Sequence, residues 1–314
     1  MIIWESELAG EKVSISKFES WMWSYLGIIV EALPFLLIGA VLSAIIQIYV
    51  SDDFIKKIIP KNSIIGYFIA AIAGIFFPVC ECAIVPIARS LIKKGLPVGV
   101  GITFMLAVPI VNPVVIMSTY YAFPDNISVV IYRTIGGVVG ALIVGLLTGI
   151  MYDKKKKDEV VKDDNVGLYC DCCTYSNNYY ISLKGKIKNL ILNASNEFLN
   201  ISIYFIFGAF LSSIFVVFMQ DSLINNMTSG KTIGIIIMMC LGFLLSLCSE
   251  ADAFVAKGFM DNFGVAGVIA FLILGPMMDL KNLILAFGFF KKKFVLKLLA
   301  MISVVVFLIC LVVV

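Results

Sequence analysis

Two cysteines flank a glutamate within an apolar stretch of the chain. Cys80, Glu81 and Cys82 are consecutive and lie between Pro78 and Pro86. Residues i and i+2 of a regular helix point in different directions, but the two prolines remove backbone hydrogen bonds and predict a break in the helix here. Across a break both thiols can face one cavity, where thiolates bind trivalent arsenic or antimony, zinc or copper(I). The pattern predicts a site for a thiol-seeking substrate; the alternative is that the cysteines only pack between helices.

A second stretch of the same character lies 168 residues further on, at Cys248, Glu250 and Asp252. If the two stretches meet, Cys248 adds a third thiol to Cys80 and Cys82. We therefore expect two tips of the chain to face each other across a substrate site. Packing alone is again the alternative for Cys248.

Carboxylates in apolar surroundings form the second group of candidates. They are Glu81, Glu250, Asp252 and Asp279. A carboxylate within a membrane is costly to bury and is a functional candidate by default. We expect these groups to bind the substrate and to exchange the coupling ion, a proton. The alternative is a set of structural ion pairs with Arg133, Lys257 or Lys281; Glu31, in the first apolar stretch, is a weaker candidate nearer the interface.

Prolines interrupt the third and seventh apolar stretches at matching places. Pro109 and Asn112 lie in the third stretch, and Pro276 and Asp279 lie in the seventh. Helices broken at matching places in two halves point to a site at the membrane midplane, because half-helix ends hold ions or polar groups. Asn112 therefore joins the candidate substrate-binding residues. The alternative is a packing kink in which the Asn112 side chain bonds to the backbone.

A third group of cysteines lies in a polar segment between the two halves. Cys170, Cys172 and Cys173 fall within four residues. Three thiols so close together resemble a capture site for a soft metal or metalloid, and a dispensable exposed loop is the alternative. We do not expect a closed zinc finger, because no second Cys or His pair lies nearby.

The composition indicates a helical membrane protein. Of 314 residues, 61% are hydrophobic and 14% are charged, with no histidine and a mean hydropathy of +1.03. The apolar stretches are long enough for transmembrane helices. They fall at about 22–49, 64–80, 98–122, 127–151, 197–219, 232–248, 264–290 and 294–314. The fold class predicted is all-α, polytopic and embedded in the cell membrane.

The chain divides into two similar halves. Residues 1–152 and 194–314 hold four apolar stretches each, and a charged linker, 153–193, separates them. Gly74 and Gly242 each precede the tip cysteine by six residues, and Gly39 and Gly208 lie at similar places in the opening stretches. Matches in the same order predict an internal repeat.

The distribution of lysine decides between two topologies. Eight full crossings would place Lys56 and Lys57, together with the cluster Lys291 to Lys293, on the outer side. If 64–94 and 232–260 are instead re-entrant hairpins turning at the two tips, these lysines and the central linker all face the cytoplasm, which the positive-inside rule prefers. We therefore predict six crossings plus two hairpins, with eight full crossings as the alternative.

Several classes of function are excluded by missing motifs. The sequence has no phosphate-binding loop, dinucleotide fingerprint, His-Glu-x-x-His pair or nucleophile elbow. We expect neither an enzyme nor a cofactor. Basic residues lie beside membrane segments, so nucleic acid is not an expected partner.

The motifs resemble a known family. Residues 77–89 with 103–114, and 246–255 with 274–282, are similar to the bacterial family of predicted permeases that includes the organoarsenical efflux permeases. The resemblance covers about 250 residues in both halves. The resemblance implies a permease; it implies an arsenical substrate less firmly, because many family members have no assigned substrate. Position by position, Cys80, Cys82 and Cys248 match the family's thiols.

These observations leave several functions to weigh. The leading hypothesis is a secondary transporter in the lipid bilayer that exports trivalent organoarsenicals or related thiol-reactive compounds. Alternatives are a transporter of zinc or another divalent metal, a membrane thiol oxidoreductase, and a channel or a subunit inactive alone. The sequence predicts no oligomeric state.

Overall fold

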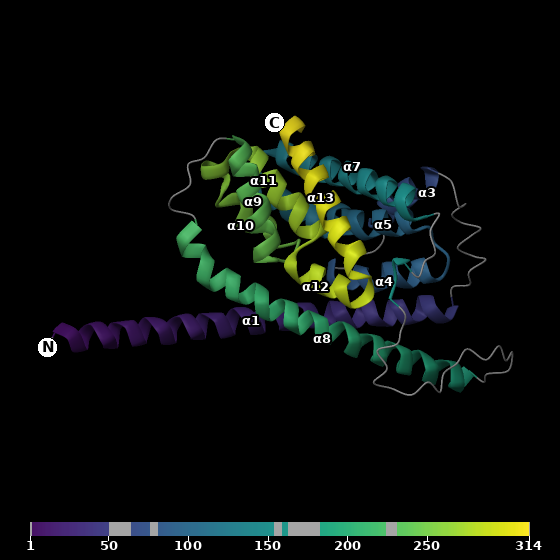
Figure 1. Cartoon of the computed structure of the whole chain (residues 1–314), viewed down its shortest axis with the longest axis horizontal. Helices are drawn as coiled ribbons and strands as arrows, with labels where there is room; N and C mark the ends of the chain where they lie inside the picture. The colour runs from purple at the N-terminus through teal and green to yellow at the C-terminus, as the bar shows by residue number, and fades with distance from the viewer. Residues whose placement is uncertain are drawn as a thin grey trace.

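The computed structural model describes residues 2–49, 64–75, 81–153, 159–162, 183–223 and 231–313. Side chains are described over 18–46, 64–75, 81–153, 159–162, 190–214 and 231–312. The helices are α1 (Ile2–Tyr49), α3 (Ile64–Ala73), α4 (Glu81–Lys93), α5 (Val98–Val111), α6 (Pro113–Ala122), α7 (Ile127–Tyr152), α8 (Leu183–Leu223), α9 (Lys231–Leu245), α10 (Asp252–Lys257), α11 (Met260–Met277), α12 (Leu280–Phe289) and α13 (Lys292–Val313) (Figure 1). Within these ranges the protein is helical throughout, apart from turns and one isolated bridge, so the all-α prediction is confirmed.

Five helical segments of the described chain are long and apolar enough to cross a membrane. They are Phe18–Ile46, Ile127–Tyr152, Leu190–Ile214, Met260–Phe289 and Lys292–Val312. A sixth crossing results if α5 and α6, which are bent by 41° at Asn112, form one broken span. Large side chains such as Val30, Ile135 and Val304 are exposed on these spans, as expected for surfaces that face lipid. The chain is thus a polytopic membrane protein.

The two predicted hairpins correspond to short helices. In the described residues α3 has 10 residues and α4 has 13, whereas α9 has 15 and α10 only 6. A helix needs about 20 residues to cross the hydrocarbon core, so none of these four is a full crossing by itself. The described helices fit the six-crossing prediction better than the alternative of eight.

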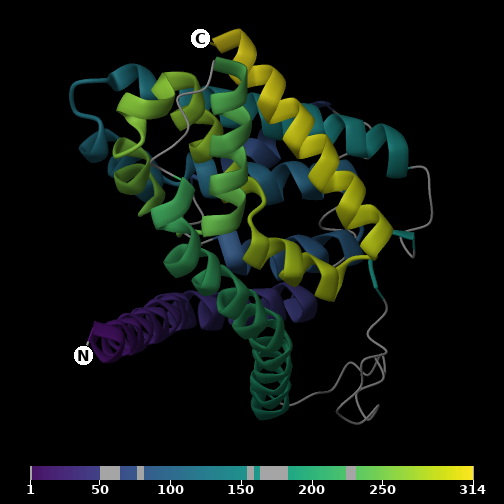
Figure 2. The same ribbon diagram turned by 60° about the vertical axis from the view of Figure 1, so that its left-hand side comes forward.

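The long helices α1 and α8 cross one another along one side of the molecule (Figures 1 and 2). Helix α1 also packs on α4, and α8 packs on α12. Gly39 allows α1 to approach α4 closely, because a Cβ there would collide with Ala83, and a Cβ at Gly208 would lie 3.1 Å from the Lys281 Cα atom. The two glycines therefore let a long helix pack against α4 and against the start of α12.

A short part of the charged linker packs against the helices. Within residues 159–162, here called the strap, Val160 and Val161 are buried. The Lys162 amide donates to the carbonyl of Phe289 at 3.1 Å, and the Lys291 amide donates to Val160 at 2.9 Å. Burial of the two valine side chains favours the packing of the strap against the helices. The many charged residues around them hid this in the sequence. Helix α8 also begins at Leu183, inside the range assigned to the linker.

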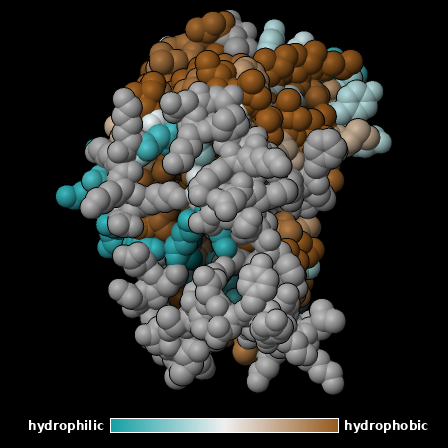
Figure 3. Space-filling model, turned by 90° about the vertical axis from the view of Figure 1, so that its right-hand side faces the viewer, coloured by the Kyte–Doolittle hydropathy of each residue, from teal (hydrophilic) through white to brown (hydrophobic). Residues whose placement is uncertain are grey.

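Hydrophobic residues cover much of the described surface in the upper part of Figure 3, and hydrophilic residues lie at the left and centre below it and at the upper right edge.

Candidate functional site

The second tip is a sharp turn between α9 and α10. Helix α9 ends at Leu245, and Ser246 has a φ of 47°, a left-handed conformation that is uncommon for residues other than glycine. The Ser246 hydroxyl donates to the carbonyl of Phe243 and accepts from the Leu280 amide at 3.0 Å. The break predicted around Cys248 is therefore present, and it is tied to the start of α12.

A hydrogen bond joins the two tips. The Ser249 hydroxyl of the second tip donates to a carboxylate oxygen of Glu81, the first residue of α4. Both residues are about 2% exposed. The structure thus brings together two residues 168 positions apart in the chain, at the point where the sequence predicted that the tips would adjoin.

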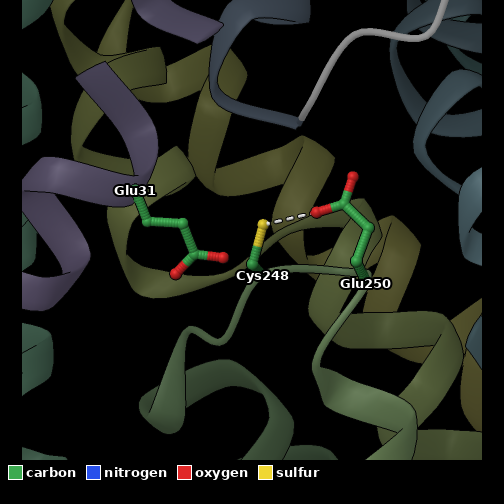
Figure 4. A group of neighbouring side chains, drawn as sticks. All are labelled: Glu31, Cys248 and Glu250. Carbon is green, nitrogen blue, oxygen red and sulfur yellow. Dashed lines mark hydrogen bonds between the residues drawn. The ribbon is translucent and has the colours of Figure 1, made fainter. Parts of the chain in front are cut away.

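Among the described residues, Cys248 lies next to two carboxylates. Its thiol donates to Oε2 of Glu250 at 3.0 Å, and Glu31 of α1 completes a group whose ligand atoms all lie within 4.8 Å of one another. Figure 4 shows the Glu31 side chain reaching from α1 toward Cys248. One sulfur and two carboxylates form a donor set that suits a divalent ion such as zinc.

Asp252 is bound in a buried ion pair. Its Oδ2 atom lies 2.7 Å from Nη2 of Arg133, and both side chains are at most 4% exposed. The sequence left this ion pair open as an alternative to a substrate-binding role. In the structure the pairing holds for Asp252.

Asp279 and Asn112 both cap helices at the two breaks. Asp279 accepts from the Asn282 amide at 2.6 Å at the start of α12, and Asn112 accepts from the Val114 amide at 3.0 Å at the start of α6. Side-chain oxygens commonly satisfy the free amides at helix N-termini in this way. The backbone bond considered as the alternative for Asn112 is therefore present.

A buried lysine lies close to this group of residues. Lys281 Nζ is 3.7 Å from Oδ2 of Asp279, and its charge lies within electrostatic range of Glu81, Cys82 and Cys248. Cys82 is 4% exposed. Lys281 therefore contributes a buried positive charge that acts on residues of both tips.

Four candidate cysteines lie outside the described residues. They are Cys80, Cys170, Cys172 and Cys173. The three-thiol site and the capture loop accordingly stay predictions.

Two contributors were missed or undervalued in the sequence. Ser249 received no role, although its place between Cys248 and Glu250 at a tip was the available signal. Glu31 was assigned near the interface, and only the packing of α1 shows that it reaches Cys248. A buried cluster of Ser43, Ser90 and Glu197 between α1, α4 and α8 was also missed.

Comparison with known proteins decides the family. Residues 20–314 match the family model described as a predicted permease. The chain belongs to this permease family. It is 40% identical over 283 residues to the UPF0718 protein YcgR of Bacillus subtilis, covering 90% of this chain and 92% of that protein. It is 36% identical over 289 residues to a Streptococcus mutans protein provisionally named a subunit of a two-component membrane permease complex, covering 92% and 93%. No solved structure matches the permease.

Proposed function

We propose that this permease is a secondary transporter whose substrate passes between the two tips. The observation that carries the proposal is the direct hydrogen bond from Ser249 to Glu81, with Cys248 and Glu250 in the same turn. A thiol and carboxylates at a contact between re-entrant segments form a site that alternating access can open from either side. The absence of nucleotide-binding motifs from the sequence agrees with coupling to an ion gradient rather than to ATP hydrolysis.

The first candidate substrate is a trivalent organoarsenical, exported from the cell. Cys82 and Cys248 supply thiols near the same lysine, and Cys80 adds a third in sequence. Glu81, Glu250 and Asp279 would exchange protons during the cycle, while Asp252 holds the site together. The charged central linker, with Cys170 to Cys173, would lie in the cytoplasm, beside the plasma membrane.

The second candidate is a divalent soft metal such as zinc, and the group of Glu31, Cys248 and Glu250 favours it. Four carboxylates, Glu31, Glu81, Glu250 and Asp279, lie in this region, and Lys281 lies beside Asp279. A divalent cation is stabilised by carboxylate ligands, whereas a neutral arsenical gains little from their charge.

One experiment separates the two candidates. Everted vesicles carrying the permease or its variants are assayed for uptake of zinc and of a trivalent methylarsenical. If the substrate is a cation, we expect Glu31→Gln to lower zinc uptake about tenfold or more, because a charged ligand is lost. If it is an arsenical, Cys248→Ser should abolish uptake while Glu31→Gln spares most of it. Uptake of both compounds that is unchanged in Cys248→Ser would show that the tip site is not the route.

Assembly with a second subunit is a further proposal. The Streptococcus mutans relative carries a name that refers to a two-component complex. If a second subunit is required, vesicles that contain this chain alone should not transport either compound.

A further inference from the structure

Arg133 is a buried cation in the fourth apolar stretch of the chain. It belongs to α7, within the span Ile127–Tyr152, and is 1% exposed. An arginine inside a membrane span is costly unless its charge and its N–H groups are satisfied. A side chain kept in such a place needs specific partners.

The three partners of Arg133 come from both halves of the permease. Nη1 donates to Oγ1 of Thr119 on α6 at 2.7 Å. Nη2 donates to Oδ2 of Asp252 at 2.7 Å and to the backbone carbonyl of Ser249 at 3.1 Å. The guanidinium therefore fastens the second tip to the first half.

The turn held by Arg133 is the turn that carries the candidate ligands. The Ala251 and Asp252 amides both donate to the Cys248 carbonyl, at 2.9 and 3.0 Å, and so close the turn on itself. Arg133 binds the Ser249 carbonyl and the Asp252 carboxylate of this turn. The hydroxyl of Ser249 then reaches Glu81, and the side chains of Cys248 and Glu250 face one another.

Apolar packing surrounds the same contact. The α6–α7 corner, with Ala122, Phe123 and Val129, belongs to one buried cluster with residues of α9, α10 and α11. This packing brings the elements together but has no directional preference for one orientation of the turn. The hydrogen bonds of Arg133 supply that direction.

We infer that Arg133 is a positioning residue of the transport site, holding the turn from Cys248 to Asp252 in the orientation that presents Cys248 and Glu250 to Glu31 and Ser249 to Glu81. This inference rests on the proposed function, which places substrate ligands in this turn. It assigns Asp252 to holding the site rather than to binding the substrate. A lysine replaces this function only in part, because a single ammonium cannot match the planar fork that serves three acceptors.

The test measures how easily the turn opens. The full-length permease in detergent is treated with a small methanethiosulfonate reagent, and labelling of Cys248 is followed by peptide mass spectrometry. We expect Arg133→Gln to raise the labelling rate roughly tenfold, since removing one partner leaves Asp252 buried and unpaired. Arg133→Lys should fall between this variant and the wild type. In vesicles, Arg133→Gln should raise KM for the transported substrate.

Arg89→Gln provides the matched control. Arg89 is also a buried arginine, 7% exposed, but it donates to the Lys162 carbonyl of the strap. We expect its loss to leave Cys248 labelling at the wild-type rate. Circular dichroism verifies that each variant keeps its helices, and if Arg133→Gln does not fold, Asp252→Asn, which removes the same ion pair, takes its place.

A folded Arg133→Gln or Asp252→Asn variant that labels at the wild-type rate would overturn the inference. If the wild-type permease transports neither zinc nor arsenical, the proposed function fails instead. The labelling measurement still decides the role of Arg133 in that case.

Discussion

At the scale of single residues, the polar side chains at the tips fall into two kinds. Arg133 and Asp252 satisfy each other in a buried pair. Cys248, Glu250 and Glu31 stay within reach of one another and are at least partly exposed, so they are accessible to a substrate. Carboxylates that look equivalent in the sequence therefore lie in different surroundings, one bound in an ion pair and the others partly exposed.

The bond between Ser249 and Glu81 gives a prediction at this scale. Ser249→Ala removes the direct link between the tips and leaves a buried Glu81 oxygen with one fewer donor. We expect it to lower the free energy of unfolding by about 1–3 kcal/mol, measured by thermal unfolding in detergent.

Ser202→Ala is the control for this change. The Ser202 hydroxyl donates to Phe198 of its own helix α8 at 2.7 Å, so its loss should cost less than about 0.5 kcal/mol. Equal unfolding of the two variants would show that the Ser249 bond contributes nothing.

At the scale of elements, the two halves use the same devices in the same order. A short apolar helix, α3 or α9, precedes each tip region, and a later helix, α5 or α11, ends where a polar side chain caps its successor. This order supports the proposal of an internal repeat. The caps differ in charge, since Asn112 is neutral and Asp279 also lies near Lys281.

That difference predicts unequal costs for removing the caps. Asn112→Ala loses one capping bond and should destabilise the permease by about 0.5–2 kcal/mol. Asp279→Ala also leaves Lys281 without its nearest carboxylate, which adds the cost of a buried unpaired charge and brings the loss to about 3–5 kcal/mol.

Asp279→Asn separates the two contributions, because it keeps a capping oxygen and loses the charge. Thermal unfolding should place it between the other two variants. An Asp279→Ala variant as stable as Asn112→Ala would show that Lys281 does not depend on Asp279.

At the scale of the whole molecule, the halves are joined by packed helices and by the strap. Helix α4 packs on α12 and α6 on α10, so each tip region is held by the other half. The strap binds across the end of α12, where the Lys162 ammonium donates to the carbonyl of Phe287, and Arg89 of α4 lies over the Phe289 ring at 5.0 Å. The linker therefore contacts helices from both halves.

A cross-link tests whether the strap stays docked. Val161 and Phe290 form an isolated antiparallel bridge, and side chains opposite one another in such a pair lie about 4.5–5.5 Å apart at Cβ. We expect Val161→Cys with Phe290→Cys to form a disulfide on mild oxidation, detected by peptide mass spectrometry. Glu159→Cys with Phe290→Cys should link much less, and equal yields from the two pairs would indicate a free linker.

The sequence alone determined the fold class, the long apolar spans and the breaks near Asn112, Cys248 and Asp279. Long apolar runs need lipid, and capping residues mark where α6 and α12 begin; both are local properties. Proline was a poorer marker, because Pro86, Pro109 and Pro276 lie inside helices and do not end them. Only the tertiary structure decided the pairings, such as Arg133 with Asp252 and Glu31 with Cys248. Their partners lie more than 100 residues apart, so which side chains meet depends on how the helices cross, and hydropathy and spacing do not encode that geometry.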